Sequence, residues 1–154
     1  MPPRAQIDAT VRDYASRGRE CAYGNLRLMT RVIGALYDDA LREVGLHAAQ
    51  LQLLWAIVAV EPVELGELSS VTHTDPTTLS RTVEKLRKAR LVDVRAGAAD
   101  GRRKEVRMTA LGRQRFAAAM PRWEAAQQKA AALLPLADVR ALAREVRRGA
   151  RNAS

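Results

Sequence analysis

A change of hydrophobic period within residues 75–109 is the strongest constraint on how this chain folds. Over 79–86 the apolar residues recur at helical spacing, whereas over 92–95 and again over 105–108 apolar and polar residues alternate, as they do along a β-strand. A glycine-bearing segment, 96–101, separates the two alternating runs. The sequence therefore predicts a helix followed by a β-hairpin.

The helix of this pair begins with a strong start signal. Asp75 is suited to accept backbone N–H bonds as the N-cap, and Pro76 suits the first helical position. A narrow apolar stripe at Leu79, Val83 and Leu86 docks the helix, so its opposite side is expected to face outward. Hydroxyls and cations occupy the first turns and the outward side: Thr77, Thr78, Ser80, Arg81 and Lys85.

Helical periodicity governs most of the remaining chain. Gly45 stops a long first helix, and Pro62 ends the second. The first ten residues are expected to form a loose tail, because they are polar and contain proline. The expected helices outside the 75–108 region are about 19–44, 46–60, 64–70, 109–134 and one from residue 136. The predicted fold class is mainly α, with one small β-hairpin.

The excess positive charge is concentrated in one segment of the chain, and this narrows the class of partner. The 154 residues carry a formal net charge of +9, and residues 81–115 alone hold twelve basic against four acidic residues, a net +8. Such a concentration indicates an anionic partner, either nucleic acid or an anionic membrane surface. A membrane-bound helix leaves its apolar face exposed, whereas this helix needs its apolar stripe for docking. Nucleic acid is therefore favoured, and no membrane partner is expected.

Composition excludes several other classes. The single cysteine, Cys21, forms no intramolecular disulfide, and no apolar run approaches the ~18 residues that cross a bilayer. Because the N-terminal residues also do not resemble a signal peptide, we expect a cytoplasmic protein. His47 and His73 are scattered relative to Cys21 and lack an acidic partner at a suggestive spacing. No enzyme, metal site or cofactor is therefore predicted.

The order of the predicted elements matches a DNA-binding architecture. Two helices joined by a short turn, the second with a polar outer face, followed by a basic hairpin, describe a winged helix-turn-helix. The first turns of the second helix would reach base edges in the major groove, where Arg81 suits guanine and Thr77 suits a base or a phosphate. The hairpin cations would contact phosphates or a narrow minor groove. A non-specific architectural nucleic-acid binder and a plain charged surface are the alternatives.

Four stretches of the chain resemble the MarR family of bacterial transcriptional regulators. They are residues 45–51, 75–81, 86–92 and 100–112. The last stretch is similar to the family's wing signature, in which an Asp is followed two residues later by an Arg, and then by a hydrophobe-Thr-x-x-Gly ending. The resemblance covers about residues 22–148.

The resemblance implies a homodimeric repressor that binds a pseudo-palindromic operator. One recognition helix would enter each major groove and one hairpin each flanking minor groove, with Arg102 at the hairpin tip and Asp100 orienting it. Arg103 and Lys104 add to the cationic tip, and a plain turn-forming role is the alternative for Asp100. The chain would then divide into a flexible tail (1–10), an N-terminal dimerisation helix (11–45), a winged helix-turn-helix lobe (46–109) and C-terminal dimerisation helices (110–150).

The resemblance also implies a small-molecule effector. Members of the family respond to aromatic or phenolic acids that bind between the dimerisation helices and the DNA-binding lobe. The candidate binding residues are Tyr23, Asn25, Arg27, Tyr37, Trp55 and Trp123. Tyr37 and Trp55 lie on apolar stripes, which is more typical of a core residue.

One branch of the family senses organic hydroperoxides through a cysteine near the start of the first helix. Cys21 lies about two residues before the matching position, which falls near Tyr23. Two residues turn a helical side chain by about 200°, to the opposite face. An inert thiol is therefore the expected role of Cys21, and a peroxide-sensing repressor is the alternative function.

Overall fold

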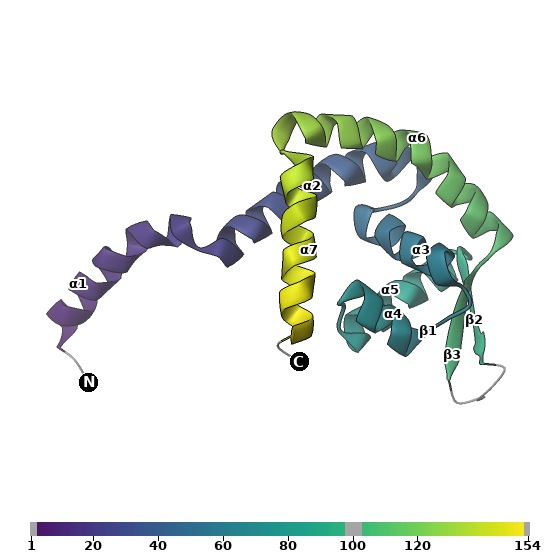
Figure 1. Cartoon of the computed structure of the whole chain (residues 1–154), viewed down its shortest axis with the longest axis horizontal. Coiled ribbons are helices and arrows are strands. Elements are labelled where there is room, and N and C mark those ends of the chain that lie inside the picture. The colour runs from purple at the N-terminus through teal and green to yellow at the C-terminus, as the bar shows by residue number, and fades with distance from the viewer. Residues whose placement is uncertain (1–2, 98–102, 153–154) are drawn as a thin grey trace. The chain divides into compact units, whose positions relative to one another are not determined.

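Helices dominate the computed structural model, which describes residues 3–97 and 103–152 (Figure 1). A 3-10 helix precedes the second α-helix at Ser16–Glu20 and another follows it at Arg42–Val44. In chain order the main elements are α1 (Arg4–Ala15), α2 (Ala22–Leu41), α3 (Ala48–Val60), β1 (Val63–Glu64), α4 (Leu65–Thr72), α5 (Pro76–Lys88), β2 (Val92–Ala96), β3 (Lys104–Met108), α6 (Ala110–Leu133) and α7 (Leu136–Asn152). The predicted class, mainly α with a small hairpin, is confirmed.

The chain forms two compact units, residues 1–36 and residues 37–154. The second unit contains an antiparallel sheet in the order β1-β3-β2, in which Val94 pairs with Val106 and Val92 with Met108. The hairpin of β2 and β3 was predicted from its alternating pattern. The strand β1 was not, because two residues directly after Pro62 are too few to show a period.

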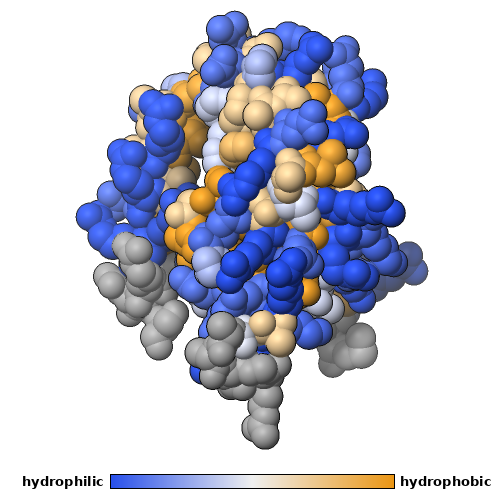
Figure 2. Space-filling view, turned by 90° about the vertical axis from the view of Figure 1, so that its right-hand side faces the viewer, coloured by the Kyte–Doolittle hydropathy of each residue, from blue (hydrophilic) through white to orange (hydrophobic). Residues whose placement is uncertain are grey.

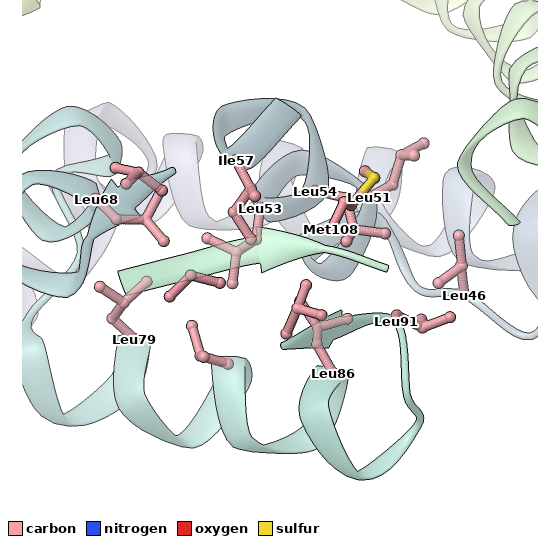
Figure 3. Packing of buried hydrophobic residues seen from close by; sticks show 14 of the residues in the cluster. Leu46, Leu51, Leu53, Leu54, Ile57, Leu68, Leu79, Leu86, Leu91 and Met108 are labelled. Atoms are coloured by element: carbon pink, nitrogen blue, oxygen red, sulfur yellow. The ribbon is translucent and has the colours of Figure 1, made fainter. Parts of the chain in front are cut away.

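The core of the second unit lies between α3, α5 and the sheet. Leu79 and Leu86 point from α5 toward the sheet and α3, where Leu54 and Ile57 are fully buried (Figure 3). Burying one such side chain contributes roughly 1.5–3 kcal/mol. The predicted apolar stripe of α5 therefore fixes which side of this helix faces outward.

Local signals set the helix ends in this unit. Gly45 ends the helical segment that contains α2 in the left-handed conformation, with φ of 68°, which glycine adopts without steric cost. Asp75 accepts a hydrogen bond from the backbone N–H of Thr78 at 2.9 Å, and Pro76 is the first residue of α5. Both predicted features of the α5 start are confirmed.

The first unit differs from its prediction. The loose tail expected over residues 1–10 is instead helical from Arg4, and α1 continues to Ala15. Polarity and proline do not exclude a helix here, because proline is tolerated where a helix starts. Alanine, arginine and glutamine favour helix, and Arg4 lies 4.0 Å from Asp8 as an i,i+4 ion pair. No residue of α1 is buried.

No single helix among the described residues is both long and apolar enough to cross a membrane. Residues 22–44 and 48–60 meet the length and composition criteria only when they are taken together, as a bent pair.

Candidate nucleic-acid interface

The outward side of α5 carries the residues that the sequence predicted to contact DNA. Leu79, Val83 and Leu86 are each at most 3% exposed, so this side of the helix is buried. The structure places the predicted residues of this helix together on its exposed surface: Thr77, Thr78, Ser80, Arg81 and Lys85. An α-helix with this arrangement fits the major groove of duplex DNA.

The N-cap holds the first turn of α5 in place. Two hydrogen bonds from Thr78 lower the pKa of Asp75, and the bond from its side chain has a larger effect than the bond from its backbone. The carboxylate is therefore ionised at neutral pH, and its negative charge lies at the positive end of the helix dipole. The hydroxyls of Thr77 and Ser80 thus project from a fixed helical turn.

The hairpin presents cations beside α5. Lys104 is exposed at the start of β3. Arg103 forms an ion pair with Glu64 of β1, in which its Nη1 donates to Oε2 at 3.0 Å and to Oε1 at 3.2 Å. Arg102 and Asp100 lie outside the described residues.

Many arginines of the basic segment 81–115 are paired with carboxylates in the structure. The pairs are Arg87–Glu84, Arg95–Asp93, Arg103–Glu64, Arg107–Glu105 and Arg113–Glu61. Two of these carboxylates, Glu61 and Glu64, lie outside the basic segment in sequence. The charge of +8 counted from the sequence therefore overstates the positive charge that this surface presents.

Glu61 also joins the hairpin to α3 from the end of that helix. Its Oε2 accepts a hydrogen bond from the backbone N–H of Met108 at 2.6 Å, and its Oε1 accepts one from the guanidinium of Arg113. The base of the hairpin is thereby tied to the residue that follows α3.

Three cations of α5 have no ion-pair partner among the described residues. Arg81, Lys85 and Lys88 form no ion pair within 3–97 and 103–152, and all three are exposed. Lys104 of the hairpin likewise lacks an ion-pair partner in that part of the chain. Seen from the side on which the hairpin lies in Figure 1, the described surface is mostly hydrophilic, with hydrophobic residues showing between the charged ones (Figure 2).

A groove of about 470 Å³ separates α5 from the hairpin. Val83 and Val94 line it as apolar residues, and the charged residues come from both sides. Its polar lining is Ser80, Glu84 and Arg87 from α5, with Arg95 and Lys104 from the hairpin. Glu84, Arg87 and Arg95 were not predicted as site residues.

The candidate effector residues divide between the two units. In the second unit the hydroxyl of Tyr37 donates to Oε1 of Gln127, and burial raises the pKa of Tyr37. Trp55 makes edge-to-face contacts with Trp123, at 4.9 Å between ring centroids, and with Phe116, at 5.8 Å. These aromatic side chains pack against the hydrophobic core.

The first unit holds the other candidates on or beside α2. Tyr23 is 70% exposed, and its hydroxyl lies 3.5 Å from Nη1 of Arg27. The side-chain amide of Asn25 donates to the carbonyl of Arg19 at 2.8 Å. Cys21, directly before α2, is an exposed free thiol. No group of three or more metal-ligating side chains occurs among the residues that the structure describes.

Comparison with known proteins assigns a family to this architecture. Residues 44–103 match the sequence model of the MarR family. The transcriptional regulator MosR of M. tuberculosis, crystallised in complex with DNA, is 34% identical over 79% of this chain and 92% of MosR, with a TM-score of 0.71. The chain belongs to the MarR family. It is thus a MarR-family transcriptional regulator and not an enzyme.

Other solved MarR-like structures share the fold. A probable transcriptional regulator from Pseudomonas aeruginosa is 25% identical over 86% of this chain and 98% of its own, with a TM-score of 0.73. A mutant MarR from E. coli complexed with operator DNA is 19% identical over 88% of this chain and 96% of its own, with a TM-score of 0.74. The comparison with curated proteins gives no significant match.

Proposed function

We propose that this MarR-family regulator is a cytoplasmic repressor that binds a pseudo-palindromic DNA operator as a homodimer. The observation that carries the proposal is the outward side of α5, where exposed hydroxyls and unpaired cations lie opposite the buried stripe of Leu79, Val83 and Leu86. The DNA complex of MosR, a relative at 34% identity, supports it. The helix would enter the major groove and the hairpin the adjacent minor groove.

The proposed DNA contacts fall into two classes. Arg81 reads a base edge, with Thr77, Thr78 and Ser80 contacting bases or phosphates beside it. Lys85 and the hairpin cations bind mainly the backbone: Arg102, Arg103 and Lys104. Asp100 orients Arg102 in this proposal.

Exposed apolar residues support the homodimer. On α2 the side chains of Leu26, Met29 and Val32 are between 46% and 52% exposed. On α7, Val139, Leu142 and Val146 are between 42% and 61% exposed. Apolar stripes of this extent on two helices are typical of surfaces that a second chain covers.

We further propose that a small aromatic or phenolic acid releases the repressor from DNA. In the first unit Arg27 would hold the carboxylate, with the Tyr23 hydroxyl 3.5 Å from its Nη1, and Asn25 is a separate candidate on the same helix. In the second unit Tyr37, Trp55 and Trp123 are separate candidates for contact with an aromatic ring. Titration of the purified protein with benzoate and with salicylate, followed by tryptophan fluorescence, tests whether such an acid binds.

A second candidate mechanism of release is oxidation of Cys21. The observation behind it is that the thiol is exposed and free, so that a hydroperoxide can reach it. The test is release of bound DNA by cumene hydroperoxide in the wild type and in Cys21→Ser. Release that disappears in the variant would favour peroxide sensing over the aromatic acid.

The DNA-binding proposal is tested by capture of genomic fragments on the purified protein. Fragments recovered at moderate salt supply the operator, whose affinity is then compared with that of a scrambled duplex of the same length and composition. A specific regulator prefers its operator by ~10³-fold or more. Equal affinities would instead indicate the architectural nucleic-acid binder.

A further inference from the structure

The groove between α5 and the hairpin holds an ion pair that places a carboxylate beside the proposed DNA contacts. Glu84 accepts two hydrogen bonds from the guanidinium of Arg87, from Nε at 2.7 Å and from Nη2 at 2.8 Å. The side-chain hydrogen bonds from Arg87 lower the pKa of Glu84, so the carboxylate is charged at neutral pH. A negative charge is thereby fixed in the middle of a basic region.

The hairpin side of the groove faces this pair with two further cations. Arg95 donates Nε to Asp93 at 2.6 Å, and its terminal nitrogens make no hydrogen bond to the described residues. Lys104 lines the same groove and lies close enough to contribute to the electrostatic field at Glu84. The hairpin wall therefore supplies cationic donors for an anion, and the Ser80 hydroxyl adds a donor from α5.

The proposed docking geometry determines what crosses this groove. When α5 enters the major groove and the hairpin enters the adjacent minor groove, one sugar-phosphate strand separates the two elements. That strand must pass over the surface between α5 and the hairpin. The groove lined by Ser80, Glu84, Arg87, Arg95 and Lys104 is that surface.

We propose that this groove is a phosphate seat, in which Arg95, Lys104 and the Ser80 hydroxyl bind a phosphate of the operator strand while Glu84 limits the affinity. Glu84 opposes the phosphate and is compensated by Arg87. The proposal rests on the proposed function; it adds Arg95 to the DNA-contacting residues, and Glu84 and Arg87 to the residues that set the affinity. Because a phosphate is the same in every sequence, the seat acts equally on operator and non-operator DNA.

The pair of Glu84 and Arg87 permits a charge-compensation test with effects of opposite sign. Glu84→Gln frees Arg87 for the phosphate, so affinity rises several-fold and the slope of log K against log salt steepens by about 0.9. Arg87→Met leaves Glu84 uncompensated, so affinity falls. The double variant returns to near the wild-type affinity. A purely structural pair would lower affinity in both single variants.

The hairpin side of the seat is tested in the same way. Arg95→Met and Lys104→Met each remove one phosphate contact, which makes the salt slope shallower by about 0.9. Glu124→Gln and Lys129→Met are the matched controls, because each changes one exposed charge on α6, outside the groove. The controls keep the wild-type slope, and all variants keep the wild-type midpoint of thermal unfolding.

Fluorescence anisotropy with the captured operator and with its scrambled duplex separates the outcomes. Equal effects of Glu84→Gln on the two duplexes support the seat, whereas an effect on the operator alone shows that Glu84 reads a base and overturns it. Unchanged salt slopes in Arg95→Met and Lys104→Met also overturn it. If the wild type fails to prefer its operator, the regulator proposal fails, while the slopes on scrambled DNA still decide the seat.

Discussion

A Cβ atom at Gly112 would lie 2.0 Å from the carbonyl oxygen of Leu91. The backbone of α6 approaches the residue before β2 this closely because Thr109 joins the two. Thr109 donates its N–H to that same carbonyl at 3.1 Å, and its hydroxyl oxygen accepts from the N–H of Gly112 at 2.9 Å. The threonine and glycine of the wing signature therefore fix the junction between the hairpin and α6.

We expect Gly112→Ala to lower the free energy of unfolding by ~1–3 kcal/mol, because the added methyl group overlaps backbone atoms that must shift to accommodate it. Urea unfolding followed by circular dichroism measures this change. The matched control is Gly66→Ala on α4, where a Cβ meets nothing within 4 Å. Equal stability of the two variants would show that the junction tolerates a side chain.

The N-cap of α5 makes stability depend on pH in a defined direction. Hydrogen bonding lowers the pKa of Asp75 in the folded protein below its value of about 3.9 in the unfolded chain. The stabilisation that the ionised cap provides is therefore fully present above pH of about 3.9, and it is lost as the pH falls through the pKa of the folded state. Asp75→Asn keeps a cap without the titrating charge, so its melting temperature should depend less on pH in that acidic range. Asp75→Ala should melt a few degrees lower at neutral pH. Identical pH profiles for wild type and Asp75→Asn would contradict this assignment.

Substitutions on α5 and at the hairpin tip should affect DNA binding differently. Arg81→Ala is expected to cost ~1–3 kcal/mol on the operator and to relax sequence choice. Arg102→Ala is expected to weaken operator and scrambled duplexes more nearly alike. Competition binding against a panel of single-base operator variants measures both effects. A harmless Arg81→Ala would mean that another part of α5 reads the bases.

Tyr37→Phe removes the hydrogen bond to Gln127 while keeping the ring in its half-buried position. We expect a loss of about 0.5–1.5 kcal/mol in the free energy of unfolding, as for a typical hydrogen bond. Tyr23→Phe on α2 is the control, because that ring is largely exposed. Chemical unfolding measures the free energy of unfolding of both variants. A loss in Tyr37→Phe no larger than that in Tyr23→Phe would show that the hydrogen bond to Gln127 does not stabilise the fold.

Local signals were enough to predict the elements that carry the interface. The Asp75-Pro76 start and the stripe of Leu79, Val83 and Leu86 depend only on neighbours in sequence, and the structure shows both. The pairing of Arg103 with Glu64 could not be predicted, because 39 residues separate the partners and only the sheet brings them together. A sequence count of charge cannot detect such neutralisation.

The residues of the phosphate seat carry partial signals in the sequence. Glu84 and Arg87 stand three residues apart on a predicted helix, the spacing at which opposite charges pair. Asp93 and Arg95 stand two apart on a predicted strand and therefore share a face. The groove itself required the packing of α5 against the hairpin, which no local pattern specifies.

The most direct test of the central claim is the affinity of the wild-type protein for its captured operator and for the scrambled duplex across a range of salt concentrations. The account predicts a preference of ~10³-fold or more at physiological salt, with a steep salt dependence for both duplexes. Equal affinity for the two duplexes would contradict it, because α5 would then contribute charge without reading sequence.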